Sequence, residues 1–321
     1  LGFIAAMGSP SSETRAPQAR GVGRFTTRGL RRRPLSRVYR APAKSSCGTM
    51  GPMTDDHAAD TAPVLLHIEG GIATVTFNRP DAMNSLDLAT KDLLVPTIRQ
   101  VAEDPAVRCV VITGNGRAFC VGQDLKEHIA GLMAGDEGLG VTVTKHYNPV
   151  AEMLATMNKP VIAAMNGVAA GAGASIAMGA DFRIMVEGGG MNLAFAGIAL
   201  SCDTGSSFWL PRLVGVAKAK ELLLLPRTLS AAECLELGLV TTVVTADDFA
   251  GEVAALATKL AAGPTLAYGA MRRAVAYSAT HDLTEALAFE SELMNATGAA
   301  NDHRVAVDAF LAKQKPVFEG R

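Results

Sequence analysis

The sequence predicts an α/β fold in which a largely parallel sheet is followed by a helical region. Cys109–Thr113 and Val161–Met165 are short, continuously apolar runs, which are typical of strands buried on both faces of a parallel sheet. Phe182–Val186 is a third run of this kind. Helical spacing of apolar residues precedes the first run, at Leu86–Val101, so strands alternate with helices. Beyond about Ala246 only the helical spacing continues.

The sheet begins with a hairpin and the chain ends in helices. Val64–Ile68 and Ile72–Phe77 flank Glu69-Gly70-Gly71, a spacing that predicts two antiparallel strands joined by a tight turn. In the last quarter of the chain, helical periodicity predicts four helices, at Phe249–Leu260, Thr265–Tyr277, Leu283–Met294 and Val305–Lys313.

Composition divides the chain into three parts. Of 321 residues, 49% are hydrophobic and 19% charged, which excludes a disordered or fibrous chain. Residues 1–53 differ: they are rich in Arg, Ser, Pro and Gly, with nine arginines and Lys44 against one acidic residue, Glu13. We interpret residues 1–53 as a disordered basic arm, which lies upstream of the true start if translation begins at Met50 or Met53. We expect residues 54–245 to form the α/β core and residues 246–321 the C-terminal helical region.

The basic arm has two other interpretations. An organelle transit peptide is also rich in Arg and Ser and poor in acids. A nucleic-acid-binding arm ranks last, because aromatic residues are only sparsely interleaved with the arginines. The net charge of the whole chain is -1, which argues against nucleic acid as a main partner.

Cysteine usage and hydropathy indicate a soluble cytoplasmic protein. The five cysteines are odd in number and form no C-x-x-C pair, so we expect neither a metal site nor a disulfide scaffold. Val161–Ala180 is uncharged, but it is poor in Leu and broken by Asn166-Gly167. A buried strand entering a buried helix explains this segment better than a membrane span.

Two junctions between a strand and a loop carry the features of a catalytic site. The first strand leads through Gly114-Asn115-Gly116 to Gly122-Gln123-Asp124, and the second leads to Gly171-Ala172-Gly173 at the start of a helix. Small residues let a ligand approach the main chain, and the first turn of a helix has unpaired N–H groups. Two such groups that point to one place would form an oxyanion hole. The alternative for each turn is tight packing of helix on strand.

The second junction also resembles two unrelated motifs. Gly171-x-Gly173 after a strand is part of a dinucleotide-binding fingerprint, but Ile176 stands where the third glycine belongs. Gly173-Ala174-Ser175-Ile176-Ala177 approaches the nucleophile elbow of serine hydrolases, with Ala177 in place of its last glycine. Asp203 and then His281 or His303 follow in the order that such a triad requires, so a serine hydrolase remains the rival class of enzyme.

Taken together, the landmarks of the chain resemble those of the crotonase (enoyl-CoA hydratase/isomerase) superfamily over nearly all of Val64–Arg321. The resemblance implies a core of repeated strand–strand–helix units arranged as a spiral (the crotonase-like ββα spiral core), followed by a C-terminal helical domain. The landmarks are FNRP at 77–80 with MNSL at 83–86, AFCVGQDLKE at 118–127, KPVIAAMNGVAAGAG at 159–173, LPRLVG at 210–215 and FLAKQKPVFEGR at 310–321.

The resemblance implies an acyl-CoA (enoyl-CoA) substrate and a shared enolate intermediate. In this family two main-chain N–H groups hold the thioester oxygen, and the matching positions here are Gln123 and Ala172. Coenzyme A enters as part of the substrate, so no separate cofactor is implied. The resemblance also implies a homotrimer or a dimer of trimers. Positions that match the family's contacts with CoA are Met83, Asn84, Ser85, Gln123, Asp124, Leu125, Lys126 and Ala172, together with Phe310 and Lys313, which often reach the site of a neighbouring subunit.

The sequence departs from the family's hydratases at both catalytic glutamates. Ser175 and Phe195 occupy those positions, and neither side chain is an efficient general acid or base. Asp203 matches an aspartate that is typical of members resembling epoxyphenylacetyl-CoA isomerases and some double-bond-shifting isomerases. One carboxylate suffices to move a proton between two carbons, and apolar surroundings strengthen it as a base. The alternative role for Asp203 is to cap a helix beginning near Ser206.

We therefore expect an enoyl-CoA isomerase-type proton shuttle with Asp203 as base. An enoyl-CoA hydratase of fatty-acid β-oxidation is the nearest alternative, and a weakly catalytic CoA- or RNA-binding family member is the third. Asp124 and Asp181 match structural positions of the family. The segment that follows Gln123, including His128 and His146, is expected to be a loop that faces the substrate, and neither histidine is assigned a role.

Overall fold

A computed structural model describes residues 61–135 and 138–321, and all of them fall within one compact unit, Thr54–Arg321. The basic arm that we expect at residues 1–53 lies outside the described residues. Strands β1 (Val64–Glu69) and β2 (Ile72–Phe77) pair in antiparallel register, with Glu69 opposite Ile72. Gly70 and Gly71 both have positive φ, 57° and 79°, as a two-residue hairpin turn requires. The predicted hairpin is confirmed.

The main sheet contains six strands in the order β1-β2-β3-β5-β7-β10. Strands β3 (Cys109–Gly114), β5 (Val161–Met165), β7 (Phe182–Val186) and β10 (Thr242–Val244) extend it, and every pair from β2–β3 to β7–β10 is parallel. The three apolar runs of the sequence are therefore the central strands of a largely parallel sheet, as predicted.

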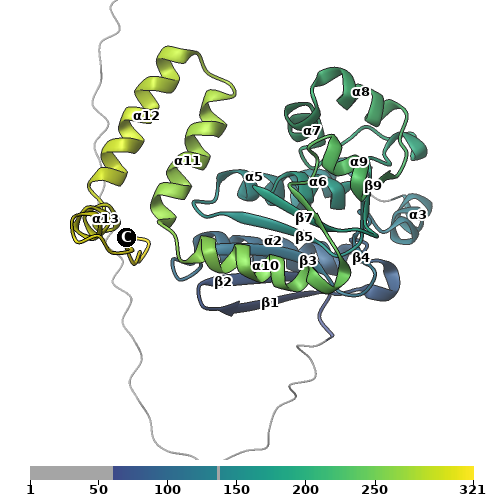
Figure 1. Ribbon diagram of the computed structural model, residues 1–321. Helices are drawn as coiled ribbons and strands as arrows, with labels where there is room; N and C mark the ends of the chain where they lie inside the picture. The colour runs from purple at the N-terminus through teal and green to yellow at the C-terminus, as the bar shows by residue number, and fades with distance from the viewer. Residues whose placement is uncertain (1–60, 136–137) are drawn as a thin grey trace, which may run out of the picture. The chain divides into compact units, whose positions relative to one another are not determined.

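A second sheet was missed by the sequence analysis. It has the order β4-β6-β8-β9, formed by β4 (Ala118–Cys120), β6 (Val168–Ala170), β8 (Gly190–Asn192) and β9 (Leu229–Ser230). Strands of two or three residues are too short to show a period, which is why the pattern did not reveal them. Since β3, β5 and β7 are each followed by a strand of this sheet, both sheets are filled in chain order, which is the spiral that the resemblance implied (Figure 1).

Both faces of the main sheet are covered. Cys109 and Val111 of β3 pack with Ala257 and Leu260 of helix α10 (Ala246–Ala261), whereas Val110 and Ile112 belong to the larger core on the opposite face. That larger core includes residues of α2 (Leu88–Glu103) and α5 (Asn148–Thr156). Burial on both sides explains why the strands are continuously apolar rather than alternating.

The apolar pattern predicted that this helix begins at Leu86, but α2 begins two residues later, at Leu88. The Asp87 side chain accepts a hydrogen bond from the Thr90 amide at 2.8 Å and caps the helix, while Leu86 forms a bridge with Gln123. The remaining helices between the strands are η1 (Pro80–Ala82), α3 (Leu125–Ala134), α4 (Gly138–Thr142), η2 (Val143–Tyr147, a π-helix), α6 (Ala172–Met178), η3 (Ala196–Ile198), α7 (Ser206–Val214), α8 (Val216–Leu224) and α9 (Ala231–Glu236).

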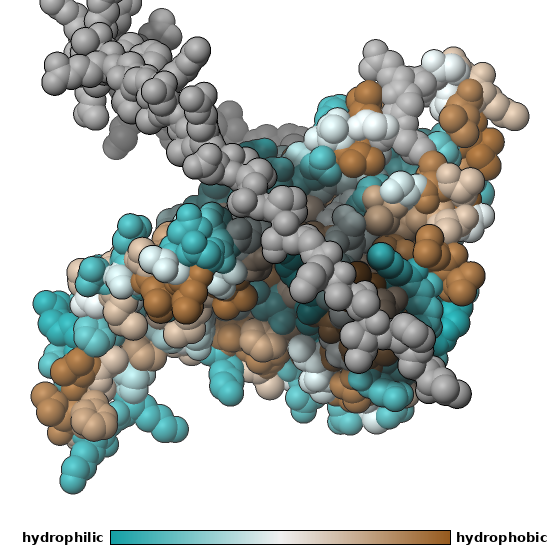
Figure 2. Space-filling model, turned by 90° about the horizontal axis from the view of Figure 1, so that it is seen from above, coloured by the Kyte–Doolittle hydropathy of each residue, from teal (hydrophilic) through white to brown (hydrophobic). Residues whose placement is uncertain are grey.

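Four helices close the chain, as predicted. After α10 come α11 (Thr265–Ser278), α12 (Leu283–Gly298) and α13 (Asn301–Leu311). α10 packs on the sheet, and α11 is joined to the core by Arg272, whose Nε lies 2.8 Å from the Asp181 carboxylate. Large apolar side chains are exposed on α11, α12 and α13, and Figure 2 shows brown patches over these helices, which lie at the left of both views. The predicted domain boundary at residues 245 and 246 stays a prediction.

The uncharged segment Val161–Ala180 contains β5, β6 and α6, which agrees with the expected strand followed by a buried helix. Across the two described ranges, no helix combines the length and the apolar character needed to cross a membrane.

Candidate active site

The two glycine-containing turns lie side by side because their strands are neighbours. β4 and β6 pair in parallel, with Ala118 opposite Val168, so their carboxyl ends lie at the same edge of the small sheet. Gly122 follows β4 with φ of 81°, and Gly171 follows β6 with φ of 50°. Only glycine adopts such angles without strain, so each turn bends sharply where its strand ends.

The main chains of the two turns touch. A Cβ atom placed on Gly122 would lie 3.0 Å from the Ala172 nitrogen. A Cβ atom on Gly173 would lie only 2.1 Å from the Cys120 carbonyl oxygen, which is closer than two atoms can approach without displacement. Glycine at these two positions therefore allows the first and second turns to meet, and places the amides of Gln123 and Ala172 next to each other.

Both of these amides are free to donate. Leu86 donates to the Gly122 carbonyl at 2.8 Å and accepts from the Asp124 amide at 3.1 Å, so the intervening Gln123 N–H points away from Leu86. Ala172 is the first residue of α6, where a helix leaves its N–H groups without an internal partner. Within residues 61–135 and 138–321, neither amide donates to another group of the protein. The arrangement suits an oxyanion that develops between the two turns.

The first turn is held by polar side chains centred on Asp124. Its carboxylate caps α3 by accepting from the Lys126 and Glu127 amides, and it also accepts from Ser85 Oγ at 2.9 Å and from Arg79 at 3.0 Å. Burial would raise the pKa of Asp124, but these hydrogen bonds and the Arg79 charge lower it below its ordinary value. Asp124 is thus an ionised cap, in agreement with the structural role that the sequence suggested.

The side chain of Gln123 is anchored from three elements. Its Oε1 accepts from the Tyr147 hydroxyl of η2 and lies 3.3 Å from Lys91 Nζ of α2, while its Nε2 lies 3.4 Å from Glu127 of α3. Lys91 is 3% exposed and pairs with Glu127 at 2.9 Å. The sequence analysis missed Tyr147 and Lys91, because a tyrosine and a lysine at ordinary helical spacing carry no signal of a site.

The segment after the first turn is helical rather than a loop, which corrects our expectation. It contains α3, α4 and the π-helix η2, and His146 is buried with its Nε2 2.9 Å from the exposed Asp92 carboxylate. π-Helical turns occur often at functional sites. Here η2 delivers Tyr147, which is 3% exposed, to the first turn.

Asp203 lies in the loop before α7 and does not cap that helix. The N-terminal cap of α7 is Gly205, and no side chain bonds to the free amides there. The capping role that we considered for Asp203 is therefore wrong. Burial raises the pKa of the Asp203 carboxyl, while hydrogen bonds from the Thr204 hydroxyl and from its own main chain oppose the rise. A carboxylate of this kind is a stronger base than an exposed aspartate.

Asp203 is related to the first turn by an electrostatic effect and to the second by hydrogen bonds of its loop. On one side, the negative charge of Asp203 acts on Tyr147, whose hydroxyl bonds to the Gln123 side chain. On the other side, the Ser206 amide donates to the Asp203 carbonyl at 2.9 Å, and Ser206 Oγ lies 2.5 Å from Ser175 Oγ in α6. The Asp203 loop and the two turns thus belong to one region of the molecule.

The Asp203 loop has an unusual main chain. Thr204 has φ of 52° and is 1% exposed, and Gly205 follows with φ of 81°. A β-branched residue is strained in this left-handed region, and such strain concentrates at functional sites. The Thr204 hydroxyl donates to Asp203 at 2.8 Å, so the strained residue also orients the carboxylate.

Ser175 cannot act as the nucleophile of a serine hydrolase. It is fully buried, and its Oγ donates to the Gly171 carbonyl at 3.0 Å and contacts Ser206. Among the described residues neither His281 nor His303 contacts it, and His281 instead stacks on Tyr277. The triad that the sequence order allowed does not form. Phe195, at the second hydratase position, is 8% exposed and belongs to the apolar core.

The residues that match the family's CoA contacts divide into three groups. Asn84 and Ser85 are buried, and their side chains bond to the first turn itself, Asn84 to the carbonyls of Asn115 and Ala118 and Ser85 to Asp124. Leu125 and Lys126 are exposed at the start of α3, and Met83 is half-buried. Phe310, which is 80% exposed, and Lys313 belong to the α13 end of the chain, which Figure 1 draws far from α3 and β4.

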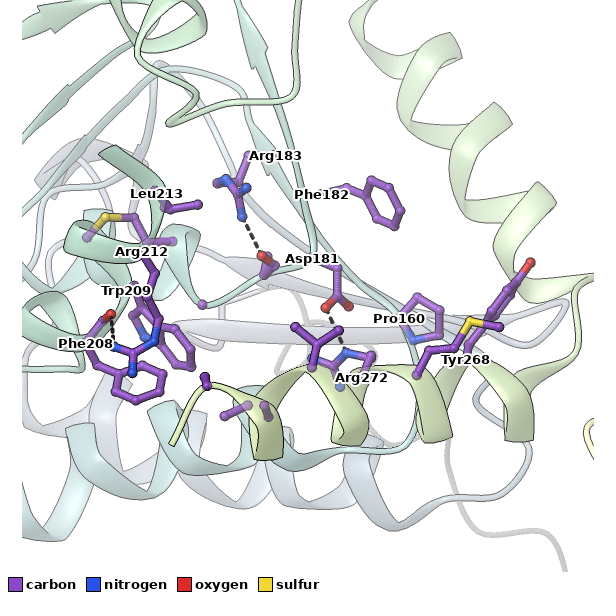
Figure 3. Close-up of a pocket in the computed structure, with 18 of the residues that line it drawn as sticks. Pro160, Asp181, Phe182, Arg183, Phe208, Trp209, Arg212, Leu213, Tyr268 and Arg272 are labelled. Carbon is purple, nitrogen blue, oxygen red and sulfur yellow. Dashed lines mark hydrogen bonds and ion pairs between the residues drawn. The ribbon is translucent and has the colours of Figure 1, made fainter. Parts of the chain in front are cut away.

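A cavity of about 540 Å³ lies between the core and α11 (Figure 3). Its walls include Trp209, Phe182 and Tyr268. Asp181 accepts from Arg272 at 2.8 Å and from the Val161 amide at 2.8 Å, and the buried Arg183 donates to the carbonyls of Leu239 and Ala180. Gln123, Ala172 and Asp203 do not line it. Asp181 therefore joins α11 to β5, which is the structural role expected for it.

Comparison with known proteins defines the class to which this fold and site belong. Residues 67–321 match the family model described as enoyl-CoA hydratase/isomerase, and the chain belongs to that family. It is 38% identical over 258 residues to the 1,2-epoxyphenylacetyl-CoA isomerase of Escherichia coli, which covers 80% of this chain and 98% of that protein. It is 33% identical over 258 residues to the short-chain-enoyl-CoA hydratase of Clostridium acetobutylicum, which covers 78% and 95% of the two chains.

A solved structure agrees with these relatives. The enoyl-CoA hydratase from Bacillus anthracis is 31% identical, has a TM-score of 0.75, and covers 81% of this chain and 100% of its own. The predicted family and fold are confirmed. Because the relatives bear both hydratase and isomerase names, similarity alone leaves the choice of reaction to the residues of the site.

Proposed function

We propose that this protein is an enoyl-CoA isomerase that moves a proton between two carbons of an acyl-CoA thioester. The carrying observation is that Asp203 is a half-buried carboxylate with a raised pKa, on a loop bonded to α6, while Ser175 and Phe195 stand at the two positions of the hydratase glutamates. A water molecule needs two such groups to orient and deprotonate it, whereas a shift of a double bond needs one group that takes and returns a proton.

The proposed mechanism uses three groups of this chain. The thioester oxygen lies between the Gln123 and Ala172 amides, and Asp203 removes a proton from carbon, which leaves an enolate whose negative oxygen the two N–H groups stabilise. The protonated Asp203 then returns the proton to a different carbon of the same substrate, so no atom is gained or lost. The raised pKa of Asp203 brings it closer to that of the carbon acid and favours removal of the proton.

The test is the mass of the product made from a 3-enoyl-CoA and from crotonyl-CoA. We expect the pure protein to convert the first without change of mass. Asp203→Asn should lower turnover by a factor of about 10² to 10⁴ and leave acyl-CoA binding intact. The matched control is Glu187→Gln, a change at an exposed acidic residue of the loop after β7, which should keep full activity. Efficient addition of water to crotonyl-CoA would overturn the isomerase in favour of a hydratase.

The CoA portion and the assembly of subunits are part of the same proposal. Lys126 is exposed beside the first turn and is suited to a phosphate group of CoA. Phe310 lies in α13 and Lys313 follows it, and Figure 1 draws α13 far from α3 and β4, which supports a role of these two residues in the site of a neighbouring subunit. Exposed apolar residues of the C-terminal helices support a homotrimer or dimer of trimers: Met271, Val275, Leu283, Leu287, Met294, Val307, Phe310 and Leu311.

A further inference from the structure

The peptide unit between Gly122 and Gln123 is held at its carbonyl, which accepts from the Leu86 amide at 2.8 Å. Gly122 lacks a side chain and has φ of 81°, so no side chain on the Gly122 side of the unit adds to this restraint. An oxyanion donor must nevertheless be held in place, because a small displacement of such a group costs much of its effect. Contacts of the Gln123 side chain would add a second restraint to the one that Leu86 supplies.

The side chain of Gln123 meets this need through groups from α2, α3 and η2. The Tyr147 hydroxyl and Lys91 both donate to Oε1, and Nε2 faces Glu127. Lys91 and Glu127 are already paired with each other at 2.9 Å, and Glu127 also accepts from the Leu88 amide at the start of α2. Tyr147 is the neutral donor of the set, and Gln123 Oε1 is the acceptor of its hydroxyl.

The surroundings of Tyr147 also indicate that it is not the residue that carries the proton. Burial, and then the negative charge of Asp203, raise the pKa of the Tyr147 phenol, so the hydroxyl stays protonated near neutral pH. Its single proton is directed at Gln123 rather than at Asp203. Asp203 thus keeps its strength as a base, while Tyr147 acts on the other part of the site.

We infer that Tyr147 is a positioning residue for the reaction: through its hydrogen bond to the Gln123 side chain, it holds the Gln123 main-chain N–H toward the thioester oxygen. This inference rests on the proposed function. It adds to that function a buried hydroxyl, from a helix that the sequence pattern did not predict, as the group that keeps one half of the oxyanion hole in place.

A double-mutant cycle tests the inference on the full-length protein. Tyr147→Phe removes only the hydroxyl, and Gln123→Met removes its acceptor but retains the main-chain N–H. We expect each change to lower kcat about tenfold with KM within about twofold, since a loosened donor costs less than the 10²–10³ lost with a removed one. The double variant should be no slower than either single one, because both remove the same hydrogen bond. Tyr277→Phe, which removes the hydroxyl of a tyrosine in α11, is the matched control and should leave kcat unchanged.

A second readout separates this inference from the proposed function. The infrared stretch of a bound thioester labelled with ¹³C at its carbonyl reports how strongly the two amides polarise it, whichever group carries the proton. We expect a shift to lower frequency in the wild-type protein and in Asp203→Asn, and a smaller shift in Tyr147→Phe.

The outcomes lead to different conclusions. Additive losses in the cycle would mean that Tyr147 acts on the substrate directly, and an unchanged kcat with a lower Tm would mean a purely structural role; either result overturns the inference. An unchanged carbonyl shift in Tyr147→Phe also overturns it and leaves the isomerase standing. If Asp203→Asn keeps full turnover while the cycle is non-additive, the proposed base is wrong and the inference survives. A protein that binds no acyl-CoA would remove both.

Discussion

The two turns supply equivalent amides, but different forces hold them. The first turn is fixed by polar side chains, since Asp124, Arg79, Ser85 and Asn84 bond to it or to one another. The second turn is fixed mainly by close packing. All residues of α6 are buried, and the main chain of Gly173 lies so close to Cys120 that no side chain fits between them. One half of the site therefore depends on hydrogen bonds and the other on close packing.

The two halves of the site should respond differently to substitution. Hydrogen bonds in a network can be removed one at a time, and each costs on the order of 1 kcal/mol net, or more when a charge is left without its partner. Where main chain packs closely on main chain, the loss of stability cannot be small, because a single added atom forces the two segments apart. Sequence changes in the second turn should thus be close to all-or-none, and changes in the first turn should be graded.

The largest expected effect is that of Gly173→Ala. The added Cβ would lie 2.1 Å from the Cys120 carbonyl oxygen, so the two turns must separate. We expect a loss of about 3 kcal/mol or more in the free energy of unfolding, together with loss of activity, measured by chemical denaturation and turnover.

Gly197→Ala in η3 is the control for this change, because a Cβ atom there would have no neighbour within 4 Å. It should alter stability by less than about 0.5 kcal/mol. Equal stability of the two variants would show that the second turn adapts, and would break the contrast between the turns.

A smaller loss is expected in the first turn from Arg79→Met. The guanidinium bonds to Asp124 at 3.0 Å, to Asp87 at 3.1 Å and to the Ser85 carbonyl at 2.6 Å, and the variant leaves the two carboxylates without that charge. We expect a loss of about 2–3 kcal/mol in the free energy of unfolding at pH 7, with the protein still folded. The exposed Arg99→Met in α2 is the control and should be neutral.

The pH dependence of that loss sharpens the comparison. Asp124 has a pKa below its ordinary value of 3.8, so its contribution to stability is present above pH 3.8 and is lost as the pH falls through the lower folded-state value. The deficit of Arg79→Met relative to the wild-type protein should therefore shrink in acid. A deficit that is constant with pH would mean that Arg79 acts by packing alone.

The smallest expected effect concerns the stability of Asp203→Asn. Burial raises the pKa of Asp203 in the folded state, so its contribution to stability is present below pH 3.8 and is lost as the pH rises through the folded-state value. The variant should thus have a higher Tm than the wild-type protein at pH 7 and little or no advantage at pH 3. A lower Tm at pH 7 would show that the charged carboxylate is satisfied in the fold, and would weaken its assignment as a base.

Most of the fold and the two glycine-containing turns of the candidate site could be predicted from the sequence. The hairpin, the three buried strands, the four C-terminal helices and the family followed from short-range patterns, because apolar period and turn residues depend on neighbours in the chain. The glycines at 122, 171 and 173 identified both turns for the same reason. The short strands of the second sheet, the helical segment before Asn148 and the start of α2 were missed or misplaced, since each is decided by contacts with distant parts of the chain.

By itself, the sequence determined which residue types are available: two glycine-lined amides, one aspartate at position 203, and no glutamate at positions 175 and 195. Only the tertiary structure decided which of them meet. In the folded chain Gly122 packs against Ala172, and Ser175 contacts Ser206. The Asp203 side chain does not cap α7, and Tyr147 donates to the Gln123 side chain. The physical reason is that burial and hydrogen bonding between residues far apart in the chain depend on the packing of whole elements, which no local pattern records.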